Sequence, residues 1–450
     1  MELMGDMGIF KLALISIVCG VLAAVSSVEA AAAMLGIAVV GVLGIALPEF
    51  ALAAVCFSGR FKGLPGLCNL PDPVYLVSFA LPGVALSTMV RIQPTDRSWL
   101  GASSRGLVYC ILFGMWLLLG VGYTPGPKYG MQKATEFLLY TFPMTAIALR
   151  IGRSGFAHAK KTIIGYYLAG LIMGLIGLIG FLLRPSLSRL ALKGGGPIVF
   201  GRMTGLAAVC GAGLLLVNGK ESTGPLESAV RLASIFLLMI ASLLSGSRGN
   251  LISGIVGLAF IALAALQNQD RVNIRTCLIV ALGVVLGVQA LAVVVRANPS
   301  IAYRFSLLLA EDKGASINVR KLYIIEAAKL FLKEPLFGYG TGSFSPLFGY
   351  GDILEYPHNV MAEIGLENGA VGLALFLLFI ASIWHSYRMG RRKTLGQQER
   401  GMCQIIWAAW LFVALGSLFS GDIYDNRLVW ILGGLLVGFR DSACCRGTRK

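Results

Sequence analysis

The most regular feature of this chain is a succession of apolar runs separated by short polar or glycine- and proline-containing turns. Many of these runs approach the ~20 residues that a helix needs to cross a bilayer. They predict an all-α polytopic membrane protein with about 12–14 transmembrane helices. The expected spans are 8–27, 30–47, 48–60, 73–91, 104–122, 133–151, 162–183, 199–217, 227–245, 250–267, 276–295, 367–386, 403–420 and 427–440.

A polar segment of unusual length interrupts this pattern between the spans that end at 295 and begin at 367. It is too long for a simple connector, so we expect a long loop that contains short helices of its own. The chain is therefore divided into an N-terminal bundle at 1–295, a long loop at 296–366, C-terminal transmembrane helices at 367–440 and a tail at 441–450.

Local signals inside the long loop predict the order of its elements. Residues 318–333 contain no glycine or proline and carry apolar side chains near one stripe, which indicates a helix that Pro335 ends. Glycine-rich turns follow at 338–342 and 349–351, where several backbone positions are permissive. Asn359 is then the expected N-cap of a helix that continues into the next span.

Composition supports the membrane assignment and adds a strong positive charge. The chain is 56% hydrophobic and only 13% charged, whereas soluble domains carry about 25% charged residues. Its mean hydropathy is +0.78 and its formal net charge is +16. Short cytoplasmic loops of membrane proteins are enriched in Lys and Arg, so the basic stretches 388–393 and 440–450 are both predicted to be cytoplasmic.

This orientation places the long loop on the outer face, where its many basic residues conflict with the same charge rule. Either the orientation is wrong, or the outer face is basic because it handles an anion. A guanidinium can grip two phosphate oxygens in a planar fork, so outer arginines are candidates for holding a phosphate. They are Arg248, which follows small residues that permit close backbone approach, and Arg320, Arg304 and Arg202. Each also has a plainer interpretation as a membrane anchor or a solvated residue.

His358 is one of three histidines and lies in the predicted outer loop. Near neutral pH an imidazole can take a proton from an acceptor hydroxyl, so His358 is a candidate general base. The plainer alternative is a loop histidine with local hydrogen bonds. Asn359 follows it, and Glu363 and Glu367 share one helix face, where they could orient His358 or an arginine or simply cap the span.

The sequence lacks several motifs of metal- or nucleotide-dependent chemistry. It contains no Asp-x-Asp, no His-x-x-x-His and no P-loop. A metal-dependent sugar transfer or an ATP-driven pump would need such a feature. We therefore expect no metal and no other cofactor, with arginines neutralising a phosphate leaving group while a base activates the acceptor.

The order of several short motifs resembles that of the O-antigen ligase and O-antigen polymerase superfamily. Two segments of the first half, Tyr129-Gly-Met-Gln-Lys133 and Gly196-Pro-Ile-x-x-Gly-Arg202, are also similar to that family. The distal motifs that carry the resemblance are Ser245-Gly-Ser-Arg248-Gly, Arg320-x-x-Tyr323, the segment from Pro335 to Phe344, and His358-Asn359 with Glu363, Glu367 and Gly369.

This resemblance implies a metal-independent, inverting glycosyltransferase at the outer (periplasmic) face of a bacterial inner membrane. It would move an oligo- or polysaccharide from an undecaprenyl-pyrophosphate carrier in the bilayer onto an acceptor hydroxyl, as in lipopolysaccharide or exopolysaccharide biosynthesis. By carry-over, Arg248 and Arg320 would hold the pyrophosphate and His358 would activate or position the acceptor. No nucleic acid partner is expected, and the positive charge is explained by the membrane and the anionic carrier.

The sequence leaves open the acceptor, a peptidoglycan-polymerising membrane transferase that shares the lipid carrier, and one different function class. A lipid A–core acceptor would make the protein a ligase, a second lipid-linked chain would make it a polymerase, and a protein hydroxyl would make it an oligosaccharyltransferase. A polysaccharide-related lipid flippase or transporter would also have many spans and outer arginines. Transport favours charged or broken helices near the membrane centre, often in two related halves, and the sequence shows no such repeat.

Overall fold

The computed structural model describes residues 47–58, 102–183, 188–192, 196–217, 225–267, 274–308, 310, 314–391 and 396–447. Every regular element in these ranges is helical, which confirms the all-α prediction. The helices up to the long loop are α3 (Pro48–Ser58), α6 (Ala102–Gly120), α7 (Pro127–Glu136), the π-helical turn η2 (Phe137–Thr141), α8 (Phe142–Arg153), α9 (Phe156–Leu182), α10 (Pro197–Leu216), α11 (Pro225–Leu244), α12 (Arg248–Gln267) and α13 (Ile274–Ala297). The later helices are α14 (Pro299–Ser306), α15 (Ala315–Lys333), α16 (Phe344–Leu347), α17 (Val360–Gly390), α18 (Gln397–Ser417) and α19 (Arg427–Gly447).

Six of the described helices, α9 to α12, α17 and α18, are long and apolar enough to cross a membrane. A broken seventh span is formed if α13 and α14, which meet at 117°, are taken together. The chain is therefore a multi-pass α-helical membrane protein, as predicted. The predicted spans 8–27 and 73–91, and nearly all of 30–47, lie outside the described residues, so the number of 12–14 stays a prediction.

The centre of the bundle depends on close contact between α8 and α19. A Cβ atom at Gly438 would lie 2.0 Å from the carbonyl oxygen of Leu149, and one at Gly152 would lie 2.3 Å from that of Leu435. Small residues let membrane helices approach in this way, since packing rather than hydrophobicity drives helix association in lipid. Beside this contact, Trp430 is 1% exposed and packs against four phenylalanine rings.

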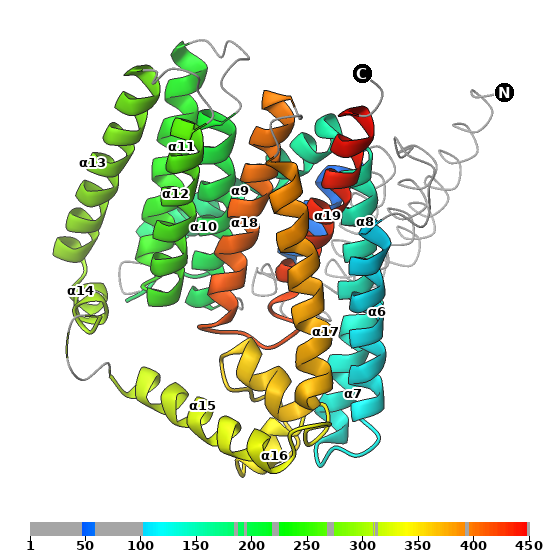
Figure 1. Cartoon of the computed structure of the whole chain (residues 1–450). Helices are drawn as coiled ribbons and strands as arrows, with labels where there is room; N and C mark the ends of the chain where they lie inside the picture. The colour runs from blue at the N-terminus through cyan, green and yellow to red at the C-terminus, as the bar shows by residue number, and fades with distance from the viewer. Residues whose placement is uncertain are drawn as a thin grey trace, which may run out of the picture.

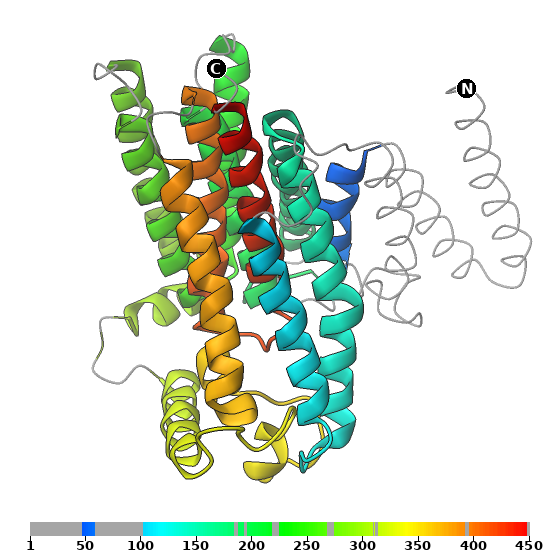
Figure 2. The ribbon, with the colours of Figure 1, turned by 45° about the vertical axis from the view of Figure 1, so that its right-hand side comes forward.

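The two ends of the bundle differ in what they carry (Figure 1). Helices α15 and α16 lie at the end opposite to the C terminus, and α17 and α19 both finish at the C-terminal end (Figures 1 and 2). This arrangement agrees with the expectation that the basic stretches 388–393 and 440–450 share one side of the membrane and the long loop lies on the other. Helix α15 matches the helix predicted at 318–333, and it ends before Pro335 as expected.

Helix α17 differs from the prediction of a continuous helix, because it breaks at Gly369 (φ 63°, ψ −162°). The segment after α15 fills the break: the amide of Ala370 donates to the Pro335 carbonyl at 2.8 Å, and the amide of Gly340 donates to the Glu367 carbonyl at 2.9 Å. Backbone groups freed by a broken membrane helix need such partners. The glycines predicted to form permissive turns do have positive φ, namely Gly338, Gly340, Gly342, Gly349 and Gly351. We call the segment 335–344 the glycine strap.

Candidate functional site

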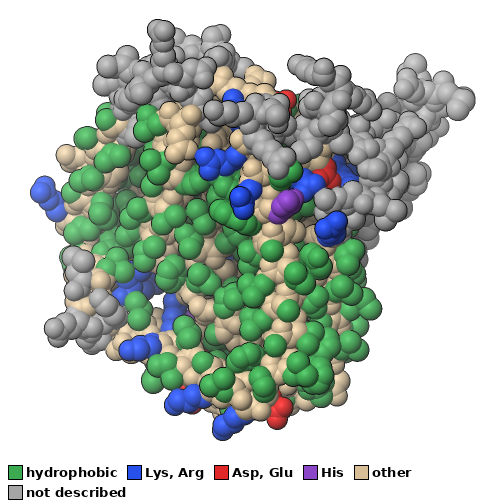
Figure 3. Space-filling model, viewed as in Figure 1, with side chains coloured by type: hydrophobic (Ala, Val, Ile, Leu, Met, Phe, Trp, Pro, Cys, Tyr) green, Lys and Arg blue, Asp and Glu red, His purple; other side chains and the backbone are tan. Residues whose placement is uncertain are grey.

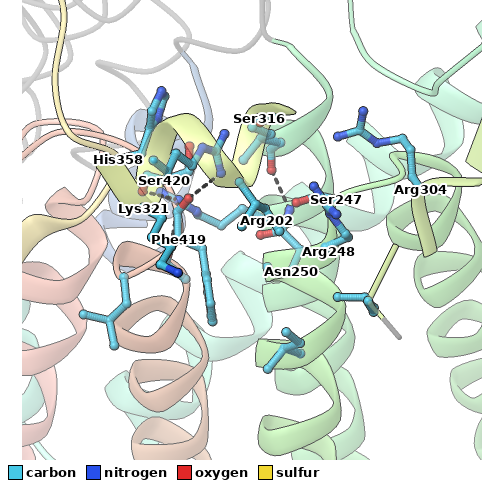
Figure 4. A pocket seen from close by; sticks show the side chains of 18 of the residues that line it. Arg202, Ser247, Arg248, Asn250, Arg304, Ser316, Lys321, His358, Phe419 and Ser420 are labelled. Carbon is cyan, nitrogen blue, oxygen red and sulfur yellow. Dashed lines mark hydrogen bonds between the residues drawn. The ribbon is translucent and has the colours of Figure 1, made fainter. Parts of the chain in front are cut away.

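A cavity of about 380 Å³ lies where α10 and α12 begin, where α18 ends, and where α14 and α15 cover them (Figure 4). We call it the basic cavity, because no carboxylate is found among the lining side chains in the part of the chain that the structure describes. Its basic side chains are Arg189, Arg202, Arg248, Arg304, Arg320 and Lys321, and His358 also lines it.

The basic cavity brings together the four arginines and the histidine singled out from the sequence, although they lie between positions 202 and 358. Their roles in binding and catalysis stay predictions. Arg189 and Lys321 join them in the lining, and sequence reasoning gave neither a role in the site. The available signal was weak, because each is simply one more basic residue in a predicted outer loop. Figure 4 shows His358 and Arg304 at opposite sides of the cavity.

Three arginines of the cavity meet at the turn that precedes α12. Gly246 has φ 62°, which a residue with a Cβ rarely adopts. Arg189 donates from Nε to the Ser245 carbonyl at 2.8 Å, and Arg304 donates from Nε to the Gly246 carbonyl at 3.1 Å. Arg248 then begins α12 on the same turn. The small residues before Arg248 therefore allow three guanidinium groups to gather.

The end of α18 anchors the other side of the cavity. Residues 418–420 form the turn that follows Ser417, the last residue of α18, and their carbonyls accept hydrogen bonds from three side chains. Arg320 donates to the Phe419 carbonyl at 2.8 Å, and Arg202 donates to the Ser420 carbonyl, also at 2.8 Å. The side-chain amide of Asn359 donates to the Leu418 carbonyl at 3.1 Å. Three elements that are distant in sequence are thus fixed to one short stretch of backbone.

Arg202 is more deeply placed than the sequence suggested. It is 4% exposed and also donates to Oδ1 of Asn426 at 2.8 Å. Most of its hydrogen-bonding capacity is therefore used within the protein. Its side chain lines the cavity, but its contacts favour a role in shaping the wall over a role as a flexible grip on a ligand.

His358 has an unusual backbone and a neutral side chain. Its φ of 59° is the only positive value at a non-glycine residue in the described part of the chain, and such strain is common at functional sites. The Tyr356 ring packs edge-on against the imidazole with centroids 4.7 Å apart, and Nδ1 has no hydrogen-bond partner among the described residues. Burial, together with the nearby Arg320, lowers the pKa of His358 to about 4, so the imidazole is neutral at pH 7.

The arginines of the cavity repel one another, which makes the cavity receptive to an anion. Burial, followed by the charges of Arg304, Arg248 and Arg320 in that order, lowers the pKa of Arg189 to about 10. Burial also lowers the pKa of Arg320. A bound anion would relieve this repulsion, and a water-poor cavity strengthens each attraction that the anion makes.

Glu363 and Glu367 have a different partner from those considered in the sequence. The Lys133 ammonium lies 2.5 Å from Oε1 of Glu363 and 2.8 Å from Oε1 of Glu367, and all three side chains are at most 1% exposed. Glu367 also accepts from the amide of Gly342 at 2.9 Å, which ties the glycine strap to α17. We call Lys133, Glu363 and Glu367 the Lys133 cluster. Asn359 caps α17 as predicted, accepting from the amides at 361 and 362.

A second cavity of about 470 Å³ lies between α10, α11, α12 and α13. Its lining is apolar except for Ser242 and Asn250, both near the basic cavity, in the part of the bundle that the structure describes. Asn250 lines both cavities. The apolar cavity therefore adjoins the basic cavity at Asn250 and extends from there among the helices.

Comparison with known protein families finds a match to part of this chain. Residues 233–377 match the family described as O-antigen ligase. Within this range the chain is similar to proteins of the O-antigen ligase and polymerase superfamily. The match confirms the resemblance seen in the motifs and supports a glycosyltransferase role of the O-antigen ligase or polymerase type. The matched range includes Arg248, Arg304, Arg320 and His358, and it ends within α17. No curated protein matches the chain.

Proposed function

We propose that this protein is a glycosyltransferase that moves a glycan from a lipid pyrophosphate to an acceptor hydroxyl within the basic cavity. The observation that carries the proposal is the composition of that cavity, which combines five arginines and a lysine with one neutral histidine. Its volume of about 380 Å³ falls in the usual range for small-ligand sites. A pyrophosphate matches the positive charge, and the histidine supplies a base.

The neighbouring apolar cavity supports a lipid-linked donor. A carrier lipid has an anionic head and a long apolar chain, and the two cavities offer these environments side by side at Asn250. Burial of hydrocarbon contributes roughly 0.8 kcal/mol for each methylene group removed from water. For undecaprenyl pyrophosphate, the basic cavity would take the head group and the apolar cavity part of the prenyl chain.

The transfer step follows from the charges in the cavity. The acceptor oxygen forms a bond to the anomeric carbon of the donor sugar while the bond from that carbon to the phosphate oxygen breaks. The electron pair of the broken bond stays on the pyrophosphate, where Arg248, Arg304 and Arg320 stabilise the added charge. The hydroxyl proton passes to the neutral imidazole of His358. Attack from the face opposite to the leaving group inverts the anomeric configuration.

The proposed location is the outer face of a bacterial inner membrane, with α14 to α16 on the periplasmic side. The arrangement of the basic stretches at the other end of the bundle supports this orientation. The region 296–366, with the start of α17, would then form the catalytic loop between two sets of transmembrane helices. The acceptor would be a lipid A–core or a second carrier-linked glycan.

The surface glycan profile of a strain that lacks this protein tests the proposal. Loss of attached polysaccharide with accumulation of lipid-linked polymer indicates a ligase, and a single attached repeat unit indicates a polymerase. Normal glycan in every fraction would exclude both activities.

A pair of histidine variants separates the enzyme from a flippase. His358→Ala should abolish transfer while the lipid-linked donor stays exposed on the outer leaflet. His385→Ala, at the far end of α17 and exposed, is the matched control and should behave as wild type. Donor trapped on the inner leaflet in the His358→Ala strain would favour the transporter.

A further inference from the structure

Helix α15 carries an apolar stripe that continues beyond the basic cavity. The stripe consists of Ile317, Ile324, Ile325, Ala328 and Leu332, which recur at the spacing of one helix face. The first three line the cavity. Ala328 and Leu332 lie past its lining, and Leu332 is 75% exposed. A contiguous exposed apolar stripe indicates a surface that contacts a partner or lipid.

The opposite edge of α15 is charged. Glu326 and Lys329 form an exposed ion pair at 2.6 Å, and Lys333 ends the helix. Arg320 and Lys321 line the cavity, whereas Lys329 and Lys333 lie on this edge. A helix that is apolar on one side and charged on the other is typical of helices that lie in the interface of a bilayer.

The segment after α15 contacts α6, and the exposed surface of α6 indicates where lipid lies. On α6, Val108, Leu112, Met115 and Leu119 form an exposed apolar stripe that reaches the last turn. This stripe is the surface that α6 presents to lipid.

Aromatic contacts place the residues after α15 beside the last turns of α6. The Phe337 ring lies 5.8 Å from the Trp116 ring of α6, and the hydroxyl of Tyr123 donates to the Phe337 carbonyl at 2.9 Å. Trp116 lies four residues before the end of α6, which is about 6 Å along the helix at ~1.5 Å per residue. Trp and Tyr are enriched at membrane interfaces. Phe337 and Leu336, both more than half exposed, therefore lie beside lipid-facing residues of α6.

The space-filling view agrees with this level. Figure 3 shows hydrophobic side chains continuing down the bundle to the end that carries α15 and α16, where Lys and Arg side chains gather. Long basic side chains can keep their charge in water while their stems lie on apolar surface.

We propose that α15 is an interfacial helix, with the part of its apolar stripe beyond the cavity (Ala328 and Leu332) and the following Leu336 and Phe337 immersed in the lipid leaflet at that end of the bundle. The occupant of this surface is the lipid bilayer, with Lys329 and Lys333 on the water-facing side of the helix. The apolar stripe then forms the wall between the basic cavity and the leaflet. This inference concerns membrane contact and does not rest on the proposed transfer reaction.

Photo-crosslinking to lipid tests the proposal in the full-length protein. p-Benzoylphenylalanine is placed singly at Leu332, Lys329 and Leu119, and each variant is reconstituted in nanodiscs of phosphatidylcholine and phosphatidylglycerol. Leu119, 63% exposed on α6, is the positive control, and Lys329 is the control on the charged edge of the same helix. Lipid adducts are measured by mass spectrometry after illumination, and thermal unfolding confirms that each variant is folded.

The expected result is a lipid-adduct yield at Leu332 comparable to that at Leu119 and several-fold above that at Lys329. A yield at Leu332 no greater than at Lys329 would overturn the proposal, because the stripe would then face water. A crosslink from Leu332 to a second copy of the chain, in place of lipid, would overturn it as well.

Discussion

Replacing Lys133 with methionine should loosen the glycine strap more than replacing Glu363 with glutamine. Lys133 is the cation between Glu363 and Glu367, and all three side chains are buried. Methionine keeps the length of the side chain and removes the charge. The two glutamates are then left without their cation in a membrane protein interior, which has little water to replace it.

The size of the effect follows from the cost of an unpaired buried charge. Removing one partner of a buried ion pair typically destabilises a protein by about 3–5 kcal/mol. An energy of this size shifts the equilibrium between closed and open states by more than roughly 100-fold. The strap should open most, since Glu367 holds the amide of Gly342 as well as Lys133.

Two further variants make the reasoning specific. Glu363→Gln should cost no more than about 1 kcal/mol, because Lys133 still contacts both oxygens of Glu367. Adding Glu363→Gln and Glu367→Gln to Lys133→Met should restore most of the lost stability, because replacing a whole buried ion pair by neutral groups is often close to neutral.

Hydrogen–deuterium exchange of the full-length protein measures the opening of the glycine strap directly. The amides of Gly340 and Gly342 should lose protection in Lys133→Met, whereas the amides around Gly152 and Gly438, where α8 and α19 pack closely, serve as the internal reference. Unchanged exchange in the strap of Lys133→Met would refute the reasoning. A triple variant that exchanges faster than Lys133→Met would refute the charge argument in particular.

Three other outcomes follow from the structure. The neutral imidazole is the active base, and the pKa of His358 is about 4 in the empty cavity, so kcat/KM should fall only below about pH 4. Bound pyrophosphate should raise the pKa of His358 and move the acid limb of the kcat profile to higher pH. Acid limbs of kcat and kcat/KM at the same pH would contradict this prediction. Gly369→Ala places a Cβ 2.4 Å from the Leu336 carbonyl oxygen at a φ of 63°, so it should lower the thermal unfolding temperature, whereas Gly180→Ala, with no atom within 4 Å, should not. Asn359→Ala should lower the free energy of unfolding by about 1 kcal/mol, because the α17 cap is lost. Asn359→Asp should keep most of the wild-type stability, because aspartate also caps helices.

Local sequence signals predicted the elements that depend on local physics. The absence of glycine and proline and the following Pro335 indicated α15, and Asn359 was recognised as a cap. The arginines and His358 were recognised by residue type and motif order. Their meeting in one cavity could be proposed from the sequence, but the carbonyls that anchor Arg320 and Arg202 belong to a helix end about a hundred or more residues away.

Contacts between distant segments were beyond the sequence. The i,i+4 spacing of Glu363 and Glu367 shows that they share a face, and it does not show that Lys133 lies opposite. The break of α17 at Gly369 is another such contact. A glycine within a span is ordinary, and the backbone groups that pair with the broken helix come from residues 335–340. Arg189 was missed because nothing local distinguishes it from other basic loop residues.

The central claim is that the basic cavity binds the pyrophosphate of a lipid-linked donor and that His358 activates the acceptor. The most direct measurement compares donor binding with single-turnover glycan transfer for purified full-length protein in nanodiscs. His358→Ala should bind undecaprenyl pyrophosphate with wild-type affinity and lose transfer, whereas Arg248→Met should weaken binding itself. Wild-type transfer by His358→Ala, or unchanged binding by Arg248→Met, would contradict the account.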